Sequence, residues 1–371
     1  MELKAARGGT LRFIHAADLH LDSAFRALEP GQAARLRQER RETLFRLADY
    51  VNSQDVRLVL LAGDVFDGGG YRETREALAE ALGRMEAWVF VAPGNHDFWG
   101  PGSPWLTDAW PENVHIFQER AMRGIELPDW GVTVHGAAFT GPEQSESLLA
   151  GFSAPRDGGV HIGLLHGETD PSEARYNPIR REEIAASGLD YLALGHIHKR
   201  REPWRVGKTL CAWPGCLEGR GFDETGEKGF YQGTVEAGAV TEPVFVPFAR
   251  RRYEVLEADV TGTSPRAAVE AALPPDTERD LYRILLTGET GEAGVRALET
   301  ALAERFYALE IQDHTRLAED VWARAGEDSL RGLFLRDLRA RWESAGSEAE
   351  RETVTLAARF GLAALDRRDL G

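Results

Sequence analysis

Residues of the types that commonly bind metal ions follow five of six short apolar runs in this 371-residue sequence. They are Asp18 and His20, Asp64, Asn95, His166, and His196 with His198. Carboxylate, imidazole and amide groups in one set suit Mn, Fe or Zn better than an all-oxygen magnesium or calcium site. These seven candidates exceed what one tetrahedral ion needs, so the set predicts two divalent ions.

The apolar runs indicate how these side chains would come together. They span 11–14, 58–61, 89–91, 132–134, 161–165 and 191–194, and runs of this length and composition are typical of buried strands. Loops beyond the carboxyl ends of strands in α/β sheets meet in one crevice, so the candidates are expected to converge. Any one of the motifs could arise by chance, and the prediction depends on all five together.

Spacing within the set refines the prediction. Asp18 and His20 are two residues apart, and an extended backbone would project both to the same side. His196 and His198 repeat this spacing, and we expect them to give one imidazole to each ion. Asp64 is the candidate for a bridging carboxylate, because its glycine neighbour lets the backbone and the metals approach closely. Two ions held in this way clamp the oxygens of an in-line displacement at phosphorus.

The elements that must position these groups form an α/β domain. Helical patterns at 32–51 and 73–85 alternate with the first three strands, which predicts a layered α/β architecture. The glycine-rich stretch 211–246 predicts further strands and a β-sandwich-like centre. We therefore place a first domain at residues 1–248.

Two further segments follow this domain. Residues 249–314 contain predicted strands at 252–260, 281–286 and 307–311 and predicted helices at 266–273 and 292–306, which indicate a small α+β domain. Residues 315–371 are predicted to be helical. One apolar face comprises Leu330, Leu333, Phe334, Leu338 and Trp342, and a second stripe comprises Leu356, Ala357, Phe360 and Ala364. This helical pair either folds back on its own domain or docks a partner.

Composition excludes several classes of protein. No apolar stretch is long enough to span a bilayer, and the first residues lack the apolar core of a secretory signal. Two cysteines, Cys211 and Cys216, are too few for a disulfide framework and read as reduced packing residues, which favours a cytoplasmic location. The formal net charge of -16 argues against nucleic acid binding, although local basic groups such as 199–201 and 250–252 remain.

Five motifs follow one another along the chain: D-x-H, GD-x-x-D, GNHD, a lone histidine and GHIH. In this order they resemble the signature of the calcineurin-like metallophosphoesterases. Segments 15–22 and 192–198 are similar to the DNA double-strand-break-repair nuclease branch, of SbcD/YhaO type. The stretches PGCLEGR at 214–220 and ETGEKG at 224–229 look most like its YhaO-type exonucleases. The resemblance implies a metallophosphoesterase fold of two facing β-sheets flanked by helices, and manganese-dependent cleavage of DNA phosphodiesters. The α+β segment is similar, in element order, to the capping domain of this branch.

The resemblance also implies roles for individual residues. Asp18, His20, Asp64 and His198 would hold one ion, and Asp64, Asn95, His166 and His196 would hold the other. His96 matches the catalytic histidine that is not a ligand, which contacts the scissile phosphate and assists the leaving oxygen. Asp67 and Asp97 are expected at the catalytic centre as carboxylates that orient imidazoles, or, for Asp97, that steady the loop. Some members of the branch carry histidine at the position of Asp67, which leaves a direct phosphate contact there open.

Partners follow from the same branch, in which the nuclease works with an SMC-like coiled-coil ATPase bound through a C-terminal helical segment. Here only 330–365 could serve that role, and the family commonly forms homodimers. Three functions stay open at this point: a DNA exonuclease or endonuclease subunit, a small-molecule phosphoesterase, and a scaffold that does not catalyse. Acidic charge favours the second, the extra domain and helices favour the first, and a complete ligand set disfavours the third.

Overall fold

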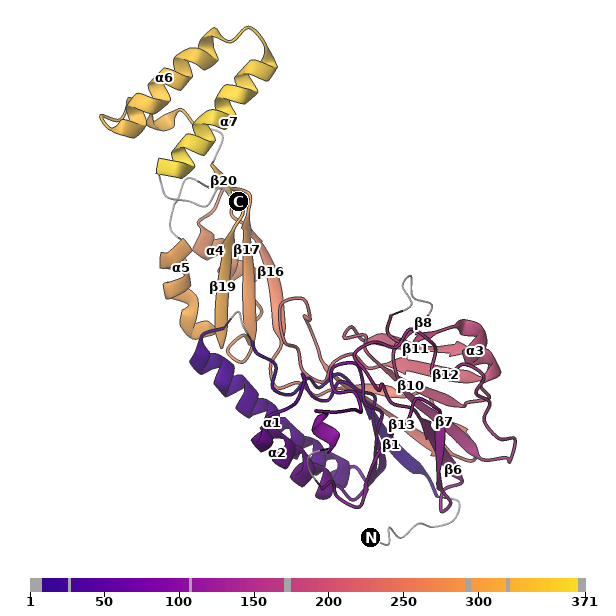
Figure 1. The fold of residues 1–371 in the computed structure, drawn as a ribbon. Coiled ribbons are helices and arrows are strands. Elements are labelled where there is room, and N and C mark those ends of the chain that lie inside the picture. Colours follow the sequence, from indigo (N-terminus) through magenta and orange to yellow (C-terminus); the bar gives the residue numbers. More distant parts are fainter. Residues whose placement is uncertain are drawn as a thin grey trace. The chain divides into compact units, whose positions relative to one another are not determined.

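The computed structural model describes residues 9–25, 28–106, 109–169, 175–290, 295–317 and 321–365. The chain forms two compact units, residues 1–252 and 253–371 (Figure 1). The finer division of the second unit at residues 314 and 315 stays a prediction. The site residues predicted from the sequence all lie in the first unit, which is built from two sheets.

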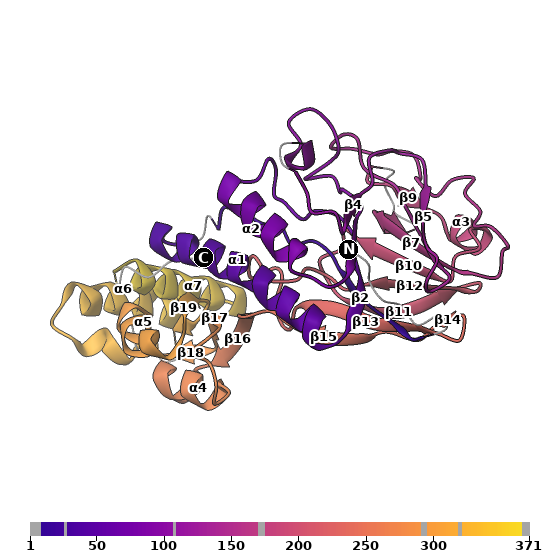
Figure 2. The same cartoon turned by 90° about the horizontal axis from the view of Figure 1, so that it is seen from below.

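The first sheet is centred on β1 (Leu11–Ala16). On one side of β1 lie three parallel strands, β2 (Val56–Leu61), β3 (Trp88–Val91) and β4 (Val114–Ile116). On the other side lies antiparallel β13 (Gly229–Glu236), which pairs with β14 (Ala239–Val240) and β15 (Val244–Pro247). Helices α1 (Pro30–Ser53) and α2 (Arg72–Gly83) connect the first three strands and lie side by side in both views (Figures 1 and 2). This is the alternation that the sequence predicted.

The second sheet has a parallel centre and antiparallel edges. Its parallel strands are β6 (Val132–Gly136), β7 (Val160–His166), β10 (Tyr191–Gly195) and β12 (Thr209–Trp213). Its edge strands are β5 (Arg123–Leu127) and β11 (Arg201–Val206). The short α3 (Arg181–Ala186), the paired β8 (Glu168–Thr169) and β9 (Pro178–Ile179), and a 3₁₀ turn at Pro104–Leu106 complete the described part of this unit.

Alternate residues of the strands enter different cores, because each sheet is covered on both faces. Leu11 and Phe13 of β1 pack between the sheets, whereas Ile14 and Ala16 pack under α1 and α2. In the second sheet, Leu164 faces the first sheet and Leu165 faces the side of α3. Strands that are buried on both faces consist of continuous apolar residues, which explains why these strands could be predicted from the sequence. The predicted arrangement of two facing sheets flanked by helices is confirmed.

The second unit contains a three-stranded sheet in the order β16 (Tyr253–Asp259), β17 (Leu281–Thr287), β19 (Ala308–Asp313). All three strands are parallel, and α4 (Pro265–Ala272) and α5 (Val295–Leu302, continued by a 3₁₀ turn at Ala303–Arg305) connect them. A two-stranded ladder joins β18 (Glu289–Thr290) to β20 (Arg316–Leu317). The order β-α-β-α-β is the predicted one. Ser264 caps α4, because its hydroxyl accepts a hydrogen bond from the Ala267 N–H.

A helical hairpin completes the second unit: α6 (Leu330–Ser344) and α7 (Glu348–Leu365) follow a 3₁₀ turn at Ala323–Gly326 (Figure 1). Its core contains Leu335, Leu338, Ala358 and Leu362, and Phe334 packs against it. The predicted apolar stripe on α7 lies outside this core, since Leu356 and Phe360 are 54% and 49% exposed. Leu330 and Leu333 of α6 are exposed as well. Among the described helices, none combines the length and apolar character needed to cross a membrane.

Candidate metal centre

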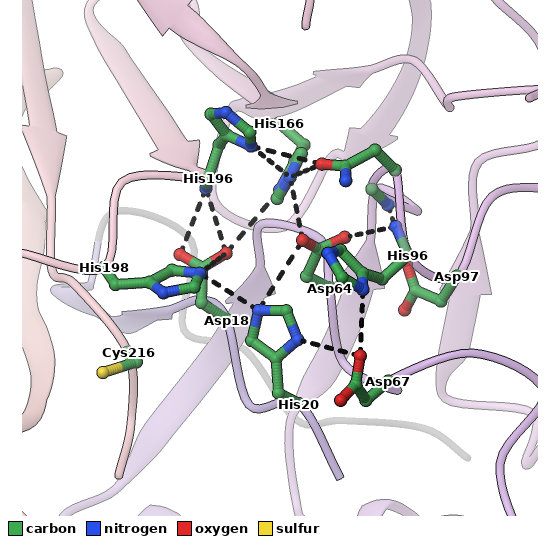
Figure 3. Close-up of polar contacts among 12 residues, drawn as sticks. Asp18, His20, Asp64, Asp67, His96, Asp97, His166, His196, His198 and Cys216 are labelled. Carbon is green, nitrogen blue, oxygen red and sulfur yellow. Dashed lines mark hydrogen bonds and ion pairs between the residues drawn. The ribbon is translucent and has the colours of Figure 1, made fainter. Parts of the chain in front are cut away.

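Five loops bring the predicted ligands together at the carboxyl ends of the strands (Figure 3). The register aligns these ends, since Ala16 pairs with Leu61, Leu61 with Val91, and His166 with Gly195. Asp18 and His20 follow β1, Asp64 follows β2, Asn95 follows β3, His166 ends β7, and His196 and His198 follow β10. All seven candidates therefore lie at one edge of the two sheets, as the sequence predicted.

The backbone that presents these ligands is not extended. Asp18, His20 and Asp64 have φ values of 52°, 42° and 49°, and that of His196 is 93°, so four candidates lie in the left-handed region or near it. The extended geometry predicted for the D-x-H pair is therefore wrong. Instead, the Asp18 and His20 N–H groups donate to the carbonyls of Gly63 and Asp64, which joins the loops after β1 and β2. Strained backbone of this kind is held only where surrounding contacts enforce it.

Three imidazoles are oriented by hydrogen bonds on their outer sides. His166 Nδ1–H donates to the Ala62 carbonyl at 2.9 Å, His196 Nε2–H to Glu168 Oε1 at 2.9 Å, and His198 Nδ1–H to Glu224 Oε1 at 2.7 Å. Acceptors on the outer side fix the tautomer, so the second nitrogen of each ring faces inward without a proton. Histidines that bind metals in proteins are held in this manner.

The inward atoms form two groups that share one carboxylate. Asp18, His20 and His198 form the first group, and Asp64, His166 and His196 form the second. Asp64 Oδ2 lies 3.3 Å from His166 Nε2 and 3.7 Å from His20 Nε2, so it reaches both groups. The amide oxygen of Asn95 lies 3.0 Å from His166 Nε2 and 3.2 Å from His196 Nδ1, which adds it to the second group.

The donor set fits divalent cations. With its Nδ1 proton given to Ala62, the bare Nε2 of His166 faces the oxygens of Asn95 and Asp64, an arrangement of lone pairs that needs a positive charge between them. Burial opposes a positive charge on His166, but Asp64 outweighs it and raises the pKa of His166 to about 9, so either a proton on Nε2 or a bound cation supplies this charge. In the first group, His20 Nε2 lies 3.1 Å from His198 Nε2, so two imidazole nitrogens face each other there. The inward atoms are therefore mostly ligand-type lone pairs under a negative potential, which divalent cations would balance.

His96 and Asp67 lie beside the first group as a hydrogen-bonded pair. His96 Nδ1 is 2.9 Å from Asp67 Oδ1, and the pKa of His96 is raised above its ordinary value by this hydrogen bond. The His96 side chain is 44% exposed, whereas the imidazole of His20 beneath it is fully buried. Its ring meets the edge of the His20 ring at 4.9 Å between centroids. His96 is therefore the exposed imidazole at the mouth of the centre (Figure 3).

Asp97 occupies a supporting position. The sequence predicts that it steadies its loop or an imidazole at the catalytic centre, and its oxygens accept backbone N–H groups of the loops. Oδ2 accepts from Val65 at 2.8 Å and Oδ1 accepts from Gly94 at 2.7 Å. The side chain is buried and ties the loop after β2 to the loop after β3. Asp97 is thus a positioning residue for Asp64 and Asn95.

Glu168, Glu224 and Arg220 were missed by reasoning from the sequence. Glu168 follows His166 by two residues, and Glu224 lies in a stretch that only its family resemblance marks. Arg220 donates from Nη2 to Glu224 Oε1 at 2.8 Å, so it holds the carboxylate that holds His198. The two glutamates are far in sequence from the histidines of the GHIH motif, and no spacing rule pairs them. Cys211 and Cys216 are buried free thiols, as expected.

Comparisons with known proteins agree with this geometry. Residues 11–200 match the family described as calcineurin-like phosphoesterase. Over 329 residues, 82% of this chain and 78% of the relative, the sequence is 34% identical to the uncharacterized metallophosphoesterase YhaO of Bacillus subtilis (strain 168). The chain belongs to the calcineurin-like metallophosphoesterase family, whose members use divalent metals and hydrolyse phosphoesters.

Two more distant relatives carry the name DNA double-strand break repair protein Mre11. That of Methanopyrus kandleri is 24% identical over 278 residues, which are 68% of this chain and 60% of the relative. That of Aeropyrum pernix is 26% identical over 281 residues, which are 67% of this chain and 64% of the relative. This chain thus spans less than two thirds of the length of either Mre11 relative.

Proposed function

We propose that this protein is a two-metal-dependent DNA phosphodiesterase, an exonuclease with or without endonuclease activity, that acts in DNA repair. The observation that carries the proposal is the complete set of seven inward-facing donors with the exposed His96 beside it. The names of the two Mre11 relatives support DNA as the substrate. The manganese ion is the first choice, since mixed nitrogen and oxygen ligands suit it.

In this proposal Asp18, His20, Asp64 and His198 hold one ion, and Asp64, Asn95, His166 and His196 hold the other. Two such ions supply an activated water and stabilise the charge on the oxygens around phosphorus. Glu168 and Glu224 keep His196 and His198 in the tautomers that leave their inward nitrogens bare. Asp64 stays ionised, because its attraction to His166 and His20 outweighs the effect of burial and lowers the pKa of its carboxyl.

His96 acts on the substrate side of the centre. Because Asp67 accepts the Nδ1–H of His96, the Nε2 of the ring is left to face the scissile phosphate. Asp67 also favours the protonated imidazole, so His96 can give a proton from Nε2 to the departing oxygen. Asp67 is the positioning residue of this pair, which is the role that the resemblance implied.

We further propose that the α6–α7 hairpin docks an SMC-like coiled-coil ATPase. The stripe that fails to enter the hairpin core (Leu356, Ala357, Phe360 and Ala364) is exposed, and the exposed Leu330 and Leu333 on α6 add to the uncovered apolar surface. An apolar stripe left uncovered on a helix suits a partner helix or coiled coil. A cytoplasmic location and a homodimer complete the proposal as expectations from the family.

A small-molecule phosphoesterase is the second candidate, and the charge distribution favours it. The net charge is -16, and two arginines of the basic group at 250–252 are neutralised. Arg250 pairs with Glu42 at 2.6 Å and Arg251 with Glu39 at 2.7 Å, both on α1. Such a protein would cleave small phosphoesters and leave DNA intact.

The two candidates are separated by substrate. Purified protein is incubated with Mn²⁺ and with single-stranded DNA, blunt duplex DNA or bis(p-nitrophenyl) phosphate, with and without a coiled-coil ATPase. We expect cleavage of linear DNA in addition to the small diester. Turnover of the small diester alone, with DNA intact in every mixture, would show that the second candidate is correct.

A further inference from the structure

A pocket of about 420 Å³ adjoins the metal centre on the side of the second sheet. Its lining residues come from β8, from the loop after β10 and from the paired ends of β11 and β12, and include Glu168, Ile197 and Trp213. Glu168 is the partner of His196, and Ile197 lies between the two histidines of the GHIH motif. A molecule in this pocket would therefore lie next to a substrate at the metal centre. The pocket's volume is in the range of sites for small ligands.

Three consecutive cations line this pocket: Lys199, Arg200 and Arg201, all exposed. Among the described residues, none forms a hydrogen bond or ion pair that would neutralise the ammonium group of Lys199. Arg200 pairs with Glu202 at 3.1 Å, but both side chains are exposed, and such surface pairs contribute little and exchange readily. These three residues are the basic group at 199–201 noted in the sequence, and none of them belongs to the predicted metal site.

The acidic residue of the lining is engaged through one oxygen. Glu168 Oε1 accepts the His196 Nε2–H, while the side chain, 28% exposed, still lines the pocket, where three cations outnumber it. Arg201 is held over two rings, 4.1 Å from the centroid of Trp204 and 5.7 Å from that of Trp213. Arg200 is held over Phe245 at 4.4 Å. Guanidinium groups fixed over aromatic faces keep their charge near the pocket at low cost in conformational entropy.

We propose that this pocket is a subsite for a second phosphate of the DNA strand, next to the phosphate at the metal centre. Lys199 and Arg200 contact that phosphate, and the attached sugar and base occupy the remaining volume beside Trp213. The subsite rests on the proposed nuclease function and adds to it a preference for substrates with more than one phosphate. It also explains how an acidic protein can select a polyanion, since the positive charge that meets the strand is local.

The test compares hexathymidylate with dithymidylate, whose single phosphodiester can occupy only the metal centre. In the full-length protein with Mn²⁺, the double variant Lys199→Ala/Arg200→Ala should lower the ratio of kcat/KM for hexathymidylate over dithymidylate at least about tenfold, because loss of one of the two charge-assisted hydrogen bonds alone is worth about a factor of ten. The dependence of log KM for hexathymidylate on log salt should become less steep by about 0.7 for each phosphate that the variant no longer neutralises.

Lys208→Ala is the matched control. Lys208 pairs with Asp190 at 2.9 Å and directly precedes β12, so its substitution removes one cation from the opposite end of the same sheet. The ratio and the salt dependence of this variant should equal those of the wild type. A double variant with the wild-type ratio would overturn the subsite while the nuclease function stands. A wild-type protein that cleaves neither oligonucleotide would overturn both.

Discussion

At the scale of residues, the centre depends on carboxylates that touch no metal. Glu224 accepts the Nδ1–H of His198 and is itself held by Arg220, whose side chain is 23% exposed. Burial would favour the neutral acid, but the hydrogen bonds from His198 and Arg220 outweigh it and hold the pKa of Glu224 well below its ordinary value. The carboxylate therefore stays charged and keeps the inward nitrogen of His198 free of a proton.

We predict that Glu224→Gln weakens metal binding about 10- to 100-fold, the range seen when a carboxylate behind a metal-binding histidine is lost. An amide holds the ring less firmly and can present its NH₂ group to Nδ1, which favours the wrong tautomer. Manganese affinity measured by equilibrium dialysis checks this. Glu227→Gln is the control, since Glu227 is exposed three residues further on. Equal affinities for the two variants would contradict the role given to Glu224.

A second prediction separates ligand from catalyst. Asp64 reaches both ligand groups, so Asp64→Ala should lose bound metal. The His96 side chain hydrogen-bonds Asp67, and its backbone N–H, which alanine keeps, donates to Asp64 Oδ1 at 2.9 Å. His96→Ala should therefore keep both ions and lose about 10²- to 10⁴-fold in kcat, the usual contribution of an acid–base group. Metal content by mass spectrometry and turnover of the small diester decide this. Loss of metal from the His96 variant would refute its assignment.

The identities of the ligands could be predicted because each follows a strand in the sequence. The carboxylates behind them could not. Glu168 and Glu224 are 28 and 26 residues away from the histidines they contact, and their approach depends on how two loops fold over the sheet. Arg220 donates to Glu224 across four residues within one loop, which no helix or strand period describes.

At the scale of elements, glycines decide how closely the loops after β2 and β3 approach. The φ of Gly94 is not in the left-handed region, so this glycine is not required by backbone conformation. Its role is steric: a Cβ there would lie 2.3 Å from Asp64 Oδ1 and 2.9 Å from His166 Cε1. Neither neighbour is a flexible end, since both are buried ligand candidates. The missing side chain is what lets Asp64 lie between the two groups.

We predict that Gly94→Ala displaces Asp64 and removes metal binding while the fold persists. Overpacking of this kind costs about 1–3 kcal/mol of stability, which a unit with three cores tolerates. Circular dichroism melting and manganese titration measure the two effects separately. Gly31→Ala is the control: it lies in α1, and nothing lies within 4 Å of its added Cβ. Normal metal affinity in the Gly94 variant would show that the close approach is not needed.

Elements were more predictable than the loops between them. The ends of α1 lie within two residues of the predicted 32–51, because its apolar face enters a core that fixes it. The loops bend through left-handed residues such as Asp18 and Asp64. Asp adopts this region more often than most residues, but no sequence pattern marks which Asp does so. On α7, Leu356 and Phe360 are as apolar as the buried Leu362, so periodicity alone does not show which of them face a core.

At the scale of the whole molecule, charge and apolar exposure are arranged separately. The net charge of -16 disfavours unspecific binding of polyanions, and the cations at 199–201 lie beside the candidate metal centre. Large exposed apolar side chains include Leu330, Leu333, Leu356 and Phe360 of the α6–α7 hairpin. We therefore expect substrate selection and partner binding to depend on different residues of one chain, which makes them separable by mutation.

The last prediction tests that separation on α7. The double variant Leu356→Lys/Phe360→Lys should abolish binding to an SMC-like coiled-coil ATPase, because it places two charges on the proposed docking stripe. Its melting temperature and its kcat/KM for dithymidylate should stay at the wild-type values, since both side chains are about half exposed in the free protein. Leu362→Ala provides the contrast: it leaves the stripe intact but removes a core side chain, and should destabilise the hairpin by about 2–5 kcal/mol. Analytical ultracentrifugation of each variant with the ATPase measures binding. Undiminished binding by the double variant would place the docking surface elsewhere on the chain.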